Sequence, residues 1–91
     1  MLYAIAYDIA DDRRRHRVHE ALKDFGRRVQ YSVFECDLKS EEIGPLARRI
    51  ETEMDEEADS CRFYRLCEAC RAEVRILGKG DQYREPEVVI V

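Results

Sequence analysis

Hydrophobic residues occupy both faces of the first extended segment of the chain. The run from Leu2 to Ile9 is almost entirely apolar or aromatic, which predicts a β-strand. Successive side chains of a strand point to opposite faces, so one face carries Leu2, Ala4, Ala6 and Asp8, and the other Tyr3, Ile5, Tyr7 and Ile9. A strand that is apolar on both faces is expected to be covered on both.

Two later segments have the periodicity of amphipathic helices. The first carries apolar residues at i, i+3, i+4 and i+7, namely Val18, Ala21, Leu22 and Phe25. Asp11 or Asp12 can cap its start, and Gly26 is a suitable stop. The second stripe consists of Ile43, Leu46, Ala47, Ile50 and Met54. Because Pro45 suits the first turn of a helix, we expect this helix to begin near Gly44.

The remaining apolar segments read as strands. Residues 29–38 predict one strand, or two joined by a tight turn near Tyr31-Ser32. Further strands are predicted over Cys61–Leu66 and Ala72–Leu77, after a loop over 55–59. A polar linker over 78–86 leads to a short apolar strand over 87–91.

The resulting order, β-α-β-β-α-β with extra C-terminal strands, predicts an α+β, ferredoxin-like sandwich with both helices on one face of the sheet. We expect one domain over 1–78, with a linker and C-terminal strand over 79–91. The helices cover only one face, so the other needs a cover, and the simplest is a second copy of the chain. The sequence therefore predicts a homodimer in which the terminal strand pairs with the partner subunit.

Composition and charge narrow the class of protein. The 91 residues suffice for one small domain, and 40% charged residues are typical of a soluble protein. No apolar run approaches the roughly 20 residues of a membrane span, and the N-terminus lacks the basic region of a signal peptide, so we expect a cytoplasmic protein with no membrane partner.

The net charge of −4 does not exclude a nucleic-acid partner, because the acidic residues concentrate between 37 and 59. Arginines cluster elsewhere, at Arg13-Arg14-Arg15, Arg17 and Arg27-Arg28. Such a cluster is either a solvated helix face or a phosphate-contacting patch, and both interpretations stay open.

Asp8 is the leading candidate for chemistry. It ends the first strand just before the acidic loop of Asp11 and Asp12, where a carboxylate can ligate a hard cation such as Mg²⁺. One carboxylate is a weak site, but a dimer with its axis near the strand ends would bring two together. The alternative is a turn or helix-capping aspartate.

Cysteine and histidine spacings are less informative. Cys67 and Cys70 have the C-x-x-C spacing of half a zinc site or a redox pair, but the other half is missing, which favours two reduced thiols in a turn. His16 and His19 are expected to be solvated histidines on an arginine-rich helix. Tyr7, Tyr31 and Phe34 can stack on bases, although strand aromatics are more often core.

Four segments together resemble the CRISPR-associated protein two family, the small subunits of the CRISPR spacer-acquisition machinery, often described as metal-dependent endoribonucleases. They are Tyr7-Asp8-Ile9 at the strand end, the Asp-Asp-Arg-Arg helix start, the Arg-Val-Gln-Tyr-Ser-Val-Phe-Glu segment over 28–35, and Asp-Ser-Cys-Arg-Phe-Tyr over 59–64. The resemblance runs from residue 1 to about 78.

The resemblance implies a ferredoxin-like homodimer in which Asp8 of each subunit holds Mg²⁺, or Mn²⁺ in its place, at the dimer cleft. It implies catalytic roles for Asp8, Ser32 and Phe34, and phosphate contacts for Arg13, Arg14, Arg17, Arg27 and Arg28. The implied function is an endonuclease acting on RNA or DNA in spacer acquisition. Alternatives are a non-catalytic dimer that bridges integrase dimers on duplex DNA, and a ferredoxin-like domain that binds a small regulatory ligand.

Overall fold

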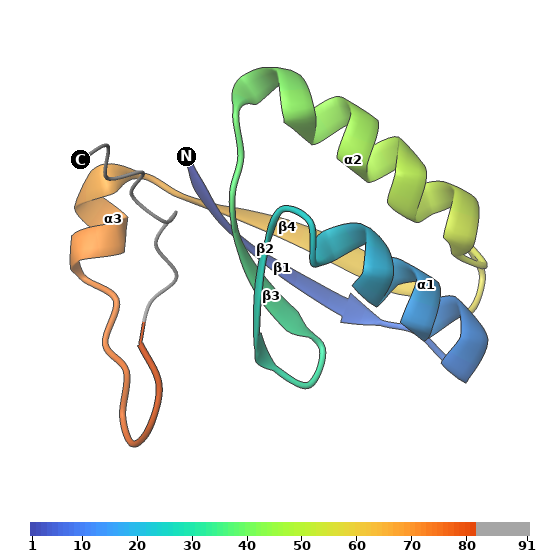
Figure 1. Cartoon of the computed structure of the whole chain (residues 1–91), viewed down its shortest axis with the longest axis horizontal. Helices are drawn as coiled ribbons and strands as arrows, with labels where there is room; N and C mark the ends of the chain where they lie inside the picture. The colour runs from blue at the N-terminus through green and yellow to red at the C-terminus, as the bar shows by residue number, and fades with distance from the viewer. Residues whose placement is uncertain (82–91) are drawn as a thin grey trace, which may run out of the picture.

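A computed structural model describes residues 1–81 of the chain (Figure 1). The elements are, in order, β1 (Leu2–Asp8), α1 (Asp12–Leu22), β2 (Gly26–Gln30), β3 (Val33–Asp37), α2 (Ser40–Glu53), β4 (Ser60–Leu66) and α3 (Glu68–Ala72). The four strands form one sheet in the order β2-β3-β1-β4, with every neighbouring pair antiparallel. The ferredoxin-like α+β fold predicted from the sequence is confirmed.

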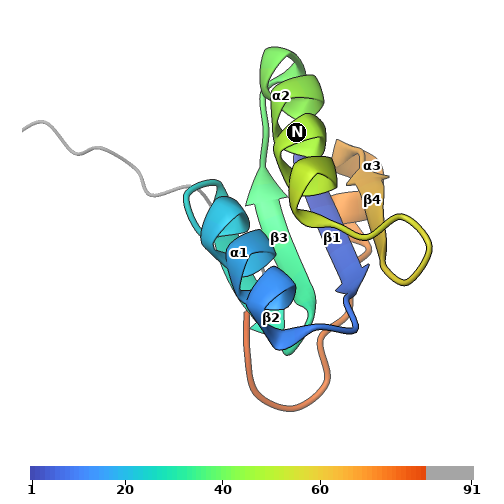
Figure 2. The same cartoon turned by 90° about the vertical axis from the view of Figure 1, so that its right-hand side faces the viewer.

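The core lies between the sheet and the two long helices. α1 and α2 lie side by side on one face of the sheet (Figure 2). The alternate residues of β1 that were expected to share a face, Tyr3, Ile5 and Tyr7, point into this core. They meet the helix stripes and β3 in one cluster that also contains Val18, Leu22, Phe34, Cys36, Leu46 and Ile50. Burying each large side chain of this kind contributes about 1.5–3 kcal/mol.

Residues 26–37 form two strands joined by a turn at Tyr31-Ser32, as one of the two sequence predictions had it. β2 begins at Gly26, which was expected only to stop the preceding helix. A Cβ at Gly26 would lie 2.0 Å from the carbonyl oxygen of Glu35 on β3. Only glycine therefore allows the two strands to approach this closely.

The second helix begins earlier than predicted. α2 starts at Ser40 and contains Pro45 in its interior, so the expected start near Gly44 is wrong. The amide of Lys39 donates a 2.8 Å hydrogen bond to the Glu42 carboxylate, which satisfies a backbone donor at the helix start. Proline removes one amide donor from the interior of the helix.

The predicted strand over Ala72–Leu77 is also wrong. Only Ala72 of this range is in a regular element, as the last residue of the short helix α3, and the described residues 73–81 contain no strand. The Cys70 amide donates to the Cys67 sulfur at 3.4 Å and so caps the helix. Beyond α3 the chain approaches β2, where Arg27 Nη2 donates to the Asp81 carbonyl at 2.7 Å. The predicted strand over 87–91, and its pairing with a partner, lie outside the described residues.

Candidate functional site

The carboxylate of Asp8 lies at the end of β1, on the sheet face that α1 and α2 leave uncovered. Asp8 is exposed, whereas the preceding Tyr7 is buried among the core residues of the helical side. Ser60 on β4 is its register partner. On the other edge of β1, next to β3, the Ser32 carbonyl accepts a 3.0 Å hydrogen bond from the Tyr7 amide. The fold thus brings Asp8 near Ser32, two of the residues predicted to be catalytic.

The other acidic residues of the following loop are committed to α1. Asp11 accepts a 3.0 Å hydrogen bond from the Arg14 amide, which confirms it as the helix cap and holds the pKa of its carboxyl below the usual value. Asp12 forms an ion pair with Arg15. Within residues 1–81, the Asp8 carboxylate makes no hydrogen bond or ion pair, and no group of three or more His, Cys, Asp or Glu is placed to hold a metal ion. At the end of β1, one protomer therefore offers a hard cation a single uncommitted carboxylate.

Phe34 lies on the opposite side of the sheet from Asp8. It is only 1% exposed. Its ring centroid is 6.3 Å from that of Tyr7 and 5.2 Å from that of His19, with an edge-to-face arrangement on His19. Its catalytic role stays a prediction, and any influence of Phe34 on Asp8 has to pass through the packing of β1.

Arg14 anchors the loops around the end of β1. Its Nε and Nη2 donate to the two carboxylate oxygens of Asp59 at 2.8 and 3.2 Å. The amides of Ala10 and Asp55 each donate to the same carboxylate at 2.9 Å. The Arg14 guanidinium, followed by the backbone donors, holds the pKa of Asp59 well below its usual range. A phosphate would reach Arg14 only by displacing this pairing.

The other predicted phosphate contacts are distributed over separate surfaces. Arg17 pairs with Glu53 at 3.1 Å and Arg27 with Asp81 at 3.1 Å. Within the described chain, Arg13 and Arg28 form no ion pair. Arg13 lies in a shallow hollow on α1, whereas Arg28 lines a pocket between α1 and β2. The predicted arginines therefore do not converge on one point, and their phosphate contacts remain predictions.

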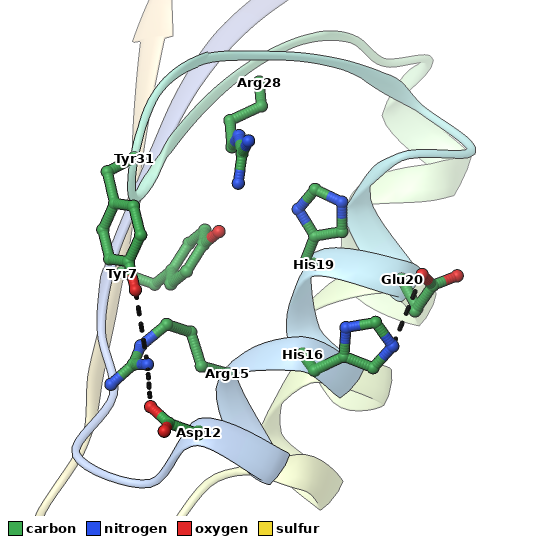
Figure 3. Close-up of a pocket in the computed structure, with 8 residues that line it drawn as sticks. All are labelled: Tyr7, Asp12, Arg15, His16, His19, Glu20, Arg28 and Tyr31. Atoms are coloured by element: carbon green, nitrogen blue, oxygen red, sulfur yellow. Dashed lines mark hydrogen bonds and ion pairs between the residues drawn. The ribbon is translucent and has the colours of Figure 1, made fainter.

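A pocket lies beside Arg28 on the helical side of the sheet. It has a volume of about 270 Å³ and lies between α1, the end of β1 and the β2–β3 turn (Figure 3). Its lining consists of Tyr7, Asp12, Arg15, His16, His19, Glu20, Arg28 and Tyr31. Figure 3 shows the Tyr7 hydroxyl and the Arg28 guanidinium pointing into the same space, with the His19 ring at its side.

The two histidines of α1 differ in environment. His16 is largely exposed and lies 3.6 Å from Glu20, as expected of a solvated histidine. The same expectation is wrong for His19, whose ring packs on buried Phe34. Burial and then the nearby Arg28 lower the pKa of His19. Burial raises the pKa of the Tyr7 hydroxyl. Both groups are therefore neutral at pH 7.

Sequence reasoning missed this pocket because its residues come from three elements. One signal was present: Asp12, Arg15, His16, His19 and Glu20 follow helical spacing and form a polar stripe beside the apolar one. Nothing in the sequence showed that this stripe of α1 would lie against Tyr7 and Arg28 on the same face of the sheet.

The C-x-x-C pair lies apart from both sites. Cys67 and Cys70 are exposed free thiols at the start of α3. Hydrogen bonds from Cys70 to the Cys67 sulfur lower the pKa of Cys67, and the same pairing raises the pKa of Cys70. This arrangement makes Cys67 the more nucleophilic thiol of the two.

Comparisons with known proteins agree on one family. The model of the family described as CRISPR associated protein Cas2 matches residues 1–74. A CRISPR-associated endoribonuclease Cas2 of Synechocystis sp. is 44% identical over 99% of this chain and 98% of its own length. Streptococcus pyogenes Cas2, solved at pH 6.5, is 34% identical with a TM-score of 0.77, covering 86% of this chain and 100% of that one. A chain of a partial Cas6-RT-Cas1–Cas2 complex is 23% identical with a TM-score of 0.78, over 99% and 98%, which shows a shared fold. No helix among residues 1–81 is long and apolar enough to cross a membrane.

Proposed function

The chain belongs to the CRISPR-associated protein Cas2 family, and from this premise we propose that it is a metal-dependent endonuclease that cleaves RNA or DNA phosphodiesters and serves in CRISPR spacer acquisition. The observation that carries the proposal is the uncommitted Asp8 carboxylate at the end of β1, on the uncovered face of the sheet. The Synechocystis relative is named an endoribonuclease, which supports the choice of reaction.

The uncovered sheet face favours a homodimer. It carries the small residues Ala4 and Ala6 on β1, opposite Tyr64 and Arg62 on β4. Tyr64 is 49% exposed, and a large aromatic side chain beside small residues offers apolar area that a partner can bury. A second copy placed face to face about a twofold axis near the strand ends would bury this face and bring the two Asp8 carboxylates together.

The residues present fit Mg²⁺ as ligands in such a dimer. Mg²⁺ prefers one or two carboxylates and keeps several water molecules, so two Asp8 side chains suffice without a cluster inside one protomer. When bound there, the ion would activate water and stabilise charge on the phosphate. The protein's own part is to hold Asp8 in place, through the register with Ser60 and the Ser32–Tyr7 backbone hydrogen bond.

Cleavage of labelled RNA and DNA by the full chain tests the proposal, with wild type compared to Asp8→Asn in Mg²⁺, Mn²⁺ and EDTA. Asn keeps the shape of the side chain but removes the charge that binds the ion, so we expect cleavage to fall by about 100-fold or more. Asp24→Asn, an exposed aspartate in the α1–β2 loop, is the matched control and should cleave like wild type. Equal cleavage by Asp8→Asn and wild type would refute the enzyme assignment.

Sedimentation equilibrium at micromolar protein tests the dimer separately. A mass of two chains is expected, and a monomeric mass would contradict the shared metal site.

A second candidate is a non-catalytic dimer that bridges integrase dimers and binds duplex DNA. It is favoured by the exposed arginines Arg13 and Arg28, which form no ion pair within residues 1–81 and are therefore available to phosphates. A chain with the same fold occurs in a partial Cas6-RT-Cas1–Cas2 complex, so this fold is compatible with a place in a larger assembly. This candidate requires the arginines and the dimer but not Asp8. It gains support if Asp8→Asn binds an integrase partner and DNA like wild type while neither protein cleaves.

A further inference from the structure

We propose that the pocket between α1 and the β2–β3 hairpin binds one nucleotide of a nucleic-acid strand, with its phosphate between Arg28, Tyr7 and His19 and its base against Tyr31. This site lies on the opposite side of β1 from Asp8, because Tyr7 and Asp8 alternate along the strand. The proposal rests on the proposed function only for the choice of nucleic acid as the source of the nucleotide.

The Tyr7 hydroxyl is the clearest sign that the pocket takes a ligand. Tyr7 is only 4% exposed as a whole residue, but its hydroxyl reaches the surface of the pocket and has no hydrogen-bond partner within residues 1–81. Figure 3 shows this hydroxyl directed into the pocket, between Arg28 and His19. A hydroxyl that faces a pocket without a protein partner is available to an acceptor oxygen of a ligand, which would displace water from it.

The charges around the pocket favour an anion at this hydroxyl. Asp12 is paired with Arg15, and Glu20 with Lys23 at 2.6 Å, so both acidic residues of the lining are already neutralised. Arg28 has no such partner within the described chain. Its guanidinium fork suits phosphate oxygens, and the Tyr7 hydroxyl and the His19 ring can each donate a further hydrogen bond.

The remaining wall of the pocket suits a base. Tyr31 is 70% exposed although it is a large aromatic residue. The Arg15 guanidinium lies 5.9 Å from its ring centroid, and Arg15 is itself held by a 2.8 Å hydrogen bond to the Ile9 carbonyl. An exposed aromatic ring beside a cation is a stacking platform for an unpaired base. A volume of about 270 Å³ lies near the lower end for small-ligand pockets, which suits one nucleotide rather than a larger cofactor.

Binding of 5′-AMP, inorganic phosphate and a short single-stranded oligonucleotide by the full chain, measured by calorimetry in EDTA, tests the site. Arg28→Gln should weaken AMP binding by about tenfold or more, because it removes a charged hydrogen bond. Tyr7→Phe removes one hydroxyl only and should weaken it about threefold to tenfold. Arg49→Gln, on the exposed side of α2, and Tyr3→Phe, further along β1, are the matched controls and should bind like wild type.

The probes separate the two parts of the ligand. Tyr31→Ala should weaken AMP binding by about fivefold or more and leave inorganic phosphate binding unchanged, because stacking requires the base. If phosphate binds as tightly as AMP, the base subsite is refuted. If neither probe binds wild type, or if Arg28→Gln and Tyr7→Phe bind like wild type while circular dichroism shows them folded, the whole pocket assignment is refuted.

His19 supplies an independent readout. The charged and titratable groups near its ring are Arg28 on β2, Tyr7 on β1, and His16, Glu20 and Lys23 on α1. A phosphate bound at this ring would favour the imidazolium, so NMR titration of His19 should show its pKa rise when AMP is added, and AMP affinity should increase as the pH falls. An unchanged His19 titration with AMP bound would place the phosphate elsewhere.

Failure of the pocket and failure of the nuclease give different results. Asp8→Asn should retain AMP binding in EDTA, because Asp8 lies on the other face of the sheet. If wild type binds AMP but shows no cleavage that depends on Asp8, only the enzyme assignment is refuted. If cleavage depends on Asp8 but AMP does not bind, only the pocket assignment is refuted.

Discussion

Replacement of Phe34 by leucine distinguishes a packing role from direct participation in catalysis. The ring is 1% exposed and contacts the rings of Tyr7 and His19, at centroid distances of 6.3 and 5.2 Å. Aromatic contacts of this kind contribute about 0.5–1.5 kcal/mol each, and the change of shape in a packed core costs up to about 1.5 kcal/mol. We therefore expect Phe34→Leu to lower the free energy of unfolding by about 1–4.5 kcal/mol. This is a substantial part of the roughly 5–15 kcal/mol that stabilises a typical protein.

Urea unfolding followed by circular dichroism, at fixed protein concentration, measures this change. Phe63→Leu on β4 is the matched control, because Phe63 also packs on the core but is only half-buried, so a smaller loss is expected. Nuclease assays at the same concentration should show that the cleavage rate per folded molecule falls less than about tenfold. Phe34 is expected to influence cleavage only indirectly, through the position of Tyr7. Unchanged stability together with abolished cleavage would refute this reasoning and place Phe34 at the reacting atoms.

Three further predictions concern stability and thiol reactivity. The pKa of Asp59 is lower in the folded chain than in the unfolded one, so the stability that it contributes is present near neutral pH and is lost as the pH falls below the unfolded value of about 4. Urea midpoints from pH 7 to pH 3 should therefore decline more steeply for wild type than for Asp59→Asn, and parallel curves would contradict the assignment. Iodoacetamide at pH 7.5 should modify Cys67 first and leave Cys36 unmodified in the folded protein, because burial raises the pKa of Cys36 to about 12. Mass spectrometry of peptides measures the order of labelling, and early labelling of Cys36 would contradict this prediction. Gly26→Ala should destabilise the β2–β3 hairpin by more than about 1 kcal/mol, because the new methyl group would overlap the backbone of β3, and an unchanged thermal midpoint would show that the strands can separate at no cost.

Much of the fold follows from local patterns. The apolar stripe of α1 and the alternation along β1 depend only on helical and strand geometry, and the structure buries the residues they single out, such as Val18 and Ile5. Asp11 caps α1 as its position before the helix indicates. Asp8 at the end of β1 could likewise be identified from sequence, because a polar residue that ends an apolar strand stands out from the pattern.

Local patterns fail where a few hydrogen bonds decide between alternatives. Pro45 suggested a late start for α2, but the contact between the Lys39 amide and the Glu42 carboxylate starts the helix earlier. The alternation of Val74 and Ile76 suggested a strand, but a strand requires a neighbouring strand to pair with. These residues follow α3 and pair with no strand in the described part of the chain.

The sequence by itself determined which faces of β1 and α1 are apolar, and with them the ferredoxin-like order, because periodicity acts within one element. Only the tertiary structure decided the partners of the polar groups. It joined Arg14 to Asp59 across 45 residues of chain, left Arg28 without an ion pair among residues 1–81, and packed the His19 ring against Phe34. These contacts depend on how elements that are far apart in the sequence pack together. Local patterns in a single sequence contain no signal for that packing.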